Sequence, residues 1–133
     1  GNAFGVWDVI VPAVGSPIVQ ALLKAEKNLK IHSATHAAVT RFGSDHLAFS
    51  KKGLSAVGVA FPPQRDEGKL RSYVAEPNNP KWLLNFIRPM IFQTYHTSGD
   101  TAQTIDPATL DMMKRLIVET VRVVGQMVKH SGV

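Results

Sequence analysis

The last part of the chain carries a pattern that is typical of one long amphipathic helix. Asp106 is a favoured N-cap residue, and Pro107 suits the first helical position. Lys129 and His130 place positive charge at the carboxyl end, where the helix dipole favours it. We therefore predict a helix over residues 107–129 that closes the core and takes no part in chemistry. Its predicted core face repeats at three- and four-residue intervals and comprises Leu110, Met113, Ile117, Val121, Val124 and Val128.

The amino-terminal part predicts two strands separated by a helix. Residues 4–11 and the nearly continuous apolar run 54–61 are typical of strands, the second one buried on both faces. Between them, Ser16 supplies a capping hydroxyl and Pro17 the first helical residue. An α/β layer fold follows from this order of elements. The expected apolar stripe of this helix comprises Ile18, Val19, Leu22, Ala25 and Leu29.

Two shorter helices are also expected. One covers residues 45–52 and ends at Gly53 in a left-handed conformation, while residues 31–44 fit either a short strand or an irregular loop. The second starts at Asn79-Pro80. Its apolar side chains predict a small satellite core, with a rim over a site or a self-association patch as alternatives. These side chains are Trp82, Leu83, Phe86 and Ile87.

The composition limits the kinds of fold, metal site and partner that this chain can have. A chain of 133 residues with 44% apolar and 19% charged residues fits one globular domain. It has no cysteine, so a metal would have to be held by His, Asp or Glu. The net charge of +5 is spread along the chain without interleaved aromatic residues, so we predict no nucleic-acid partner. No apolar run approaches the roughly 20 residues of a transmembrane helix.

Two polar motifs could carry chemistry. His96 follows Tyr95 in a turn-rich loop, where an imidazole can ligate a metal, or can simply bond to backbone. Nearby Asp100 could orient such a ring. The triplet 44–46, Ser-Asp-His, precedes the short helix, and its simplest alternative role is a helix cap. It does not predict a serine hydrolase, because no Gly-x-Ser-x-Gly elbow is present.

Together the two motifs resemble the carboxyl-terminal half of the co-catalytic zinc aminopeptidases, metallopeptidase family 28, to which the glutaminyl cyclases are related. The first motif is Ser44-Asp45-His46 followed by Phe49, Gly53 and Ala56. The second is Tyr95-His96-Thr97 followed by Asp100-Thr101 and Ile105-Asp106. The resemblance covers most of the chain, and it is weak over residues 1–40 and poor over 62–93. It implies an α/β fold, a partial three-layer α/β/α sandwich with a mixed sheet, incomplete on its amino-terminal side.

The resemblance also implies roles for individual residues. His96 would ligate one of two zinc ions, and Tyr95 would contact the substrate carbonyl or its oxyanion. Ser44 and His46 would shape the pocket for a peptide substrate. Asp45 would support proton transfer through a hydrogen-bond network. The tyrosine before His96 favours the peptidase branch, since cyclases tend to carry tryptophan there.

The chain departs from the family pattern in its other ligands. Such enzymes also use a His-x-Asp motif, a Glu-Glu pair that includes the general base, and a further aspartate, and this sequence contains neither the motif nor the pair. We therefore expect residues 1–133 to be one domain that forms the carboxyl-terminal portion of a catalytic domain. It would need the amino-terminal half as a partner and would be inactive alone.

Some alternatives remain open at this point. A glutaminyl-peptide cyclotransferase with one zinc ion, or a non-catalytic scaffold of the same fold, would carry a similar pattern. A homo-oligomer is possible, and the resemblance alone implies an exported, vacuolar or membrane-tethered protein.

Overall fold

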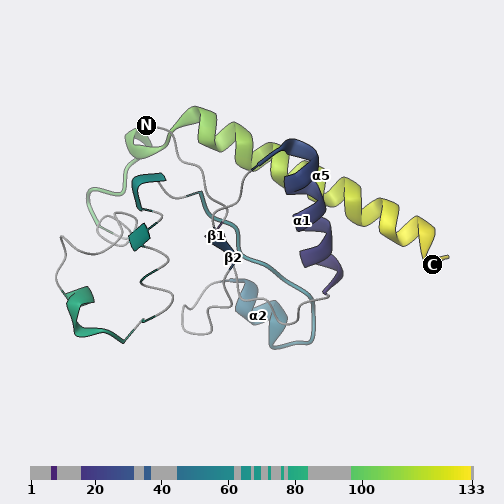
Figure 1. Ribbon diagram of the computed structural model, residues 1–133, viewed down its shortest axis with the longest axis horizontal. Helices are drawn as coiled ribbons and strands as arrows, with labels where there is room; N and C mark the ends of the chain where they lie inside the picture. Colours follow the sequence, from purple (N-terminus) through teal and green to yellow (C-terminus); the bar gives the residue numbers. More distant parts are fainter. Residues whose placement is uncertain are drawn as a thin grey trace.

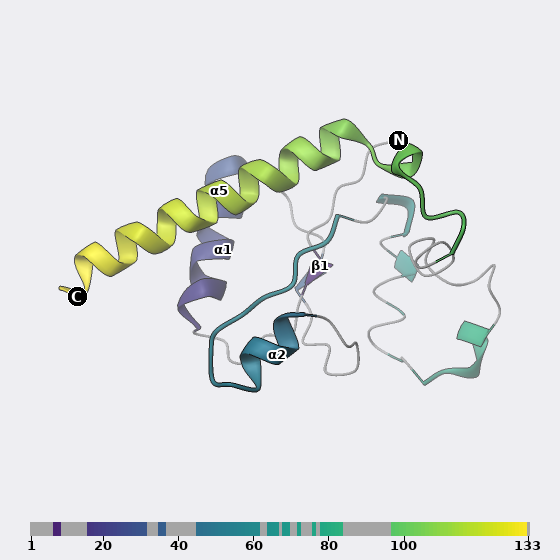
Figure 2. The same cartoon turned by 180° about the vertical axis from the view of Figure 1, so that it is seen from behind.

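Two helices that are far apart in the sequence pack against each other and hold the core (Figure 1). They are α1, Pro17–Leu29, and α5, Pro107–His130. Both views show α1 crossing beneath α5, whose carboxyl-terminal end extends past it (Figure 2). This computed structural model describes residues 7–8, 16–31, 35–36, 45–61, 64–66, 68–69, 72, 76, 78–83 and 97–132.

The core lies where α1 meets α5. Leu22 and Ala25 of α1 form a buried cluster with Ile31 and with Leu116 of α5. Burying a leucine side chain of this kind contributes about 1.5–3 kcal/mol relative to leaving it exposed. Partly buried apolar side chains complete the cluster, and they are Leu29, Val57, Val59, Phe61 and Met112.

Helix α1 confirms the predicted helix, but its first turn differs from the expectation. Ser16 is the N-cap residue, yet its hydroxyl makes no capping bond and is buried without a hydrogen-bond partner in the described part of the chain. Pro17 therefore carries the start of the helix, because its fixed φ suits the first position. At the other end Lys30 adopts a left-handed conformation (φ 55°), and its N–H group bonds to the carbonyl of Glu26. This turn brings Ile31 back into the core.

Helix α5 confirms the prediction for residues 107–129, but a different face is buried. Leu116, Thr120 and Val123 are buried, whereas most of the predicted core face is exposed. Apolar residues cover a wide arc of this helix, so their spacing does not single out the stripe that meets α1. Thr120 tolerates burial because its hydroxyl donates to the Leu116 carbonyl at 2.7 Å. The exposed members of the predicted face are Leu110, Ile117, Val121 and Val128.

The expected three-layer sandwich with a mixed sheet is wrong for the described residues. Their only sheet is a parallel pair of two-residue strands, β1 (Trp7–Asp8) and β2 (Thr35–His36), and most regular structure is helical. The predicted strand 54–61 forms no ladder, with a single bridge at Ala60, and Leu54 is 57% exposed. An apolar run does not by itself specify a strand. Here Val57 and Phe61 pack against the helical core instead.

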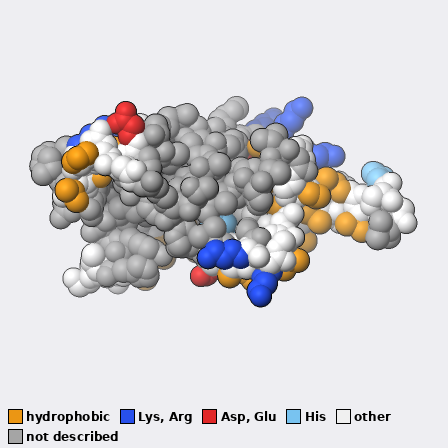
Figure 3. Space-filling model, turned by 90° about the horizontal axis from the view of Figure 1, so that it is seen from below, with side chains coloured by type: hydrophobic (Ala, Val, Ile, Leu, Met, Phe, Trp, Pro, Cys, Tyr) orange, Lys and Arg blue, Asp and Glu red, His pale blue; other side chains and the backbone are white. Residues whose placement is uncertain are grey.

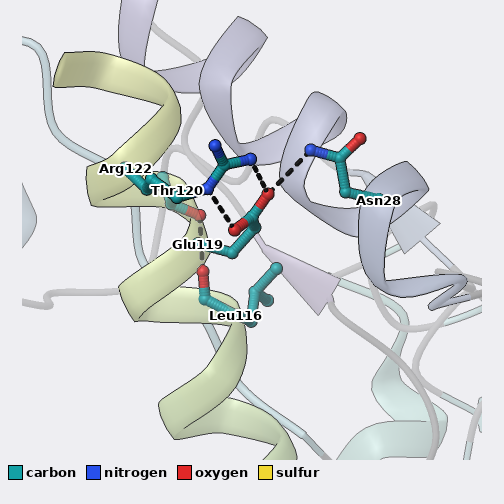
Figure 4. Close-up of polar contacts among 5 residues, drawn as sticks. All are labelled: Asn28, Leu116, Glu119, Thr120 and Arg122. Carbon is teal, nitrogen blue, oxygen red and sulfur yellow. Dashed lines mark hydrogen bonds and ion pairs between the residues drawn. The ribbon is translucent and has the colours of Figure 1, made fainter. Parts of the chain in front are cut away.

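A polar contact reinforces the helix pair beside the core (Figure 4). Asn28 of α1 donates its side-chain N–H to Glu119 of α5 at 2.7 Å. The guanidinium of Arg122 donates to both oxygens of the same carboxylate, at 2.6 and 2.7 Å. These bonds, from Arg122 first and then from Asn28, lower the pKa of Glu119 from its ordinary value of 4.5 to about 2. The carboxylate therefore stays ionised over most of the pH range.

The remaining described elements are short. They are α2 (His46–Ser50) and three 3-10 turns, η1 (Gln64–Asp66), η2 (Pro80–Leu83) and η3 (Ala102–Thr104). Of the predicted satellite core, Trp82 is buried and donates its indole N–H to the Glu76 carbonyl at 2.8 Å. The prediction is wrong for Leu83, which is 76% exposed, and Phe86 and Ile87 lie outside the described residues. Among the described helices, none has the length and apolar character to span a bilayer.

Candidate functional site

The first motif, residues 44–46, leads into helix α2, which begins at His46. The Asp45 carbonyl accepts from the Ala48 N–H at 3.1 Å, and Gly53 closes the turn with φ of 76°, as the sequence predicts. The Asp45 side chain is exposed and makes no hydrogen bond within the described part of the chain. The helix-cap alternative for this carboxylate is therefore not what the structure shows. Its partner in the motif, Ser44, lies outside the described residues.

His46 is the unusual member of this motif. Both ring nitrogens, Nδ1 and Nε2, are buried, and neither has a hydrogen-bond partner among the residues that the structure describes. A neutral imidazole carries one donor and one acceptor, and leaving such a buried group unpaired costs about 1–3 kcal/mol. Buried polar atoms without a partner are rare in folded proteins, and their explanations include local strain, a catalytic role, or a bound water or ion. A further group that reached this ring could pair with its nitrogens without breaking any hydrogen bond of the described residues.

The second motif continues into a self-bonded turn. The Thr97 hydroxyl accepts from the Gly99 N–H at 3.2 Å, and the Thr97 carbonyl accepts from the Asp100 N–H at 3.0 Å. This use of Thr97 was not predicted, although a threonine two residues before a glycine is a known turn-forming pattern. The turn fixes the chain directly after His96. Tyr95 and His96 themselves lie outside the described residues.

The chain then enters α5 at its N-cap residue, Asp106. Its carboxylate accepts from the Thr109 N–H at 3.1 Å and from the Thr109 hydroxyl at 2.7 Å. The hydroxyl bond, with the backbone bonds, lowers the pKa of the Asp106 carboxyl below its ordinary value. The predicted cap is confirmed. Helix α5 therefore begins directly after the last residue of the second motif.

The described side chains do not by themselves fit a zinc ion. Among them, no group of three His, Asp or Glu residues is close enough to share a metal. His96, the predicted ligand, lies outside this set. A metal ion at this site would need His96 together with further donors, and no catalytic step through zinc is derived from the described geometry.

Comparison with known proteins identifies the class to which the chain belongs. The sequence model of a peptidase family matches residues 9–121, which include both motifs and most of α5. The chain therefore belongs to peptidase family M28, and its chemistry is that of a peptidase of this type. No curated protein and no solved structure matches it. The match confirms the resemblance that the Ser-Asp-His and Tyr-His-Thr motifs indicate.

Proposed function

We propose that this chain supplies the carboxyl-terminal part of the active site of a zinc-dependent aminopeptidase. The match to peptidase family M28 over residues 9–121 carries the proposal. Zinc in such sites supplies an activated water when it is bound. His96 is the ligand that this chain contributes, and the other ligands and the general base come from the amino-terminal half of the catalytic domain.

The remaining motif residues act on the peptide. The Tyr95 hydroxyl donates a hydrogen bond to the oxygen that becomes negatively charged when the carbonyl is attacked. His46 and Ser44 bind the substrate, and the unpaired buried nitrogens of His46 support this role. Asp45 is a positioning residue whose exposed carboxylate orients neighbouring donors during proton transfer.

The test measures zinc content and hydrolysis of aminoacyl anilides. We expect the 133-residue chain alone to have little or no activity and the complete enzyme to be active with bound zinc. His96→Ala in the complete enzyme should abolish hydrolysis and leave the helix content unchanged. His130→Ala is the matched control, because His130 is exposed at the end of α5.

Three other outcomes would each contradict a part of this proposal. Full activity of the His96→Ala variant contradicts the ligand role. Cyclisation of an amino-terminal glutamine peptide without hydrolysis identifies a cyclotransferase instead. A complete protein that is inert and free of metal indicates a scaffold.

A further inference from the structure

We draw no further inference here: the strongest candidate, the exposed apolar patch of α5 around Ile117 and Val121 on the part of the molecule that leads to the carboxyl terminus (Figure 3), is interrupted by the exposed Lys114, and nothing in the described part of the chain shows what covers it.

Discussion

The side-chain nitrogen of Asn28 lies 2.7 Å from a carboxylate oxygen of Glu119, and this bond joins α1 to α5 across 91 positions of sequence. The Glu119 side chain is only 16% exposed, and Arg122 holds it from the other side. The carboxylate is thus shared between the two helices that form the core. Its ionisation and the packing of these helices are coupled.

The first prediction concerns stability at acid pH. The folded-state pKa of Glu119 is about 2, below the ordinary value of 4.5. The stabilisation from the ionised form is therefore complete above about pH 4.5 and is lost as the pH falls toward 2. Glu119→Gln removes this ionisable group, so the Tm measured by circular dichroism should fall less steeply between pH 5 and pH 2.

Glu76→Gln provides the matched control for this experiment. Glu76 accepts from Asn79 within its own loop and does not join the two helices. The control should keep the wild-type slope of Tm against pH. Equal slopes for wild type and Glu119→Gln would contradict the coupling.

The second prediction tests which face of α5 forms the core. Leu116 is fully buried, whereas Leu83 is 76% exposed. Leu116→Ala should lower the free energy of unfolding by about 2–5 kcal/mol, since it leaves a cavity between α1 and α5. Leu83→Ala, the same chemical change at an exposed position, should alter it by no more than about 0.5 kcal/mol. Urea denaturation measures both, and similar losses would mean that the buried face is assigned wrongly.

Local signals predicted the helices well. Asp106 and Pro107 mark the start of α5, and Gly53 marks the turn after α2, because caps and left-handed turns depend on a few neighbouring residues. Which side chains become buried depends instead on segments that are distant in the sequence. The pattern therefore gave the wrong face of α5, and it gave a strand where Val57 and Phe61 cover the helical core.

The candidate site could be predicted only in part. The sequence pointed to both motifs, and the family match supports them. It could not reveal that the nitrogens of His46 are buried without a partner, because that depends on which segments surround the ring. The hydroxyl of Ser16 shows the same limit, since a good cap residue makes no cap bond there.

The third prediction concerns the cap that joins the second motif to α5. Asp106→Ala removes the acceptor for Thr109 and should lower the Tm by a few degrees. Asp106→Asn should retain most of the stability at neutral pH, because asparagine also caps well. Since the pKa of Asp106 is lowered from 3.8, its contribution is present above that pH and is lost on acidification. The Asn variant should therefore lose part of the acid dependence of Tm.

Thr101→Ala is the control for the cap. Thr101 also precedes a helical turn, η3, but its side chain makes no capping bond. Its replacement should leave the Tm almost unchanged. A loss as large as that of Asp106→Ala would show that the bonds to Thr109 are not what stabilises this junction.

The last prediction separates a binding role for His46 from a structural one. A histidine that holds the fold together would lose hydrogen bonds on replacement, and stability would fall. His46 has no such bonds to lose, so His46→Leu, which removes two unpaired buried nitrogens, should leave the Tm unchanged or raise it. In the complete enzyme the same variant should raise KM for aminoacyl anilides more than it lowers kcat, because a contact to bound substrate is lost. His130→Leu, at the exposed end of α5, should change neither quantity. A large fall in Tm together with an unchanged KM would place His46 in the scaffold and remove it from the substrate site.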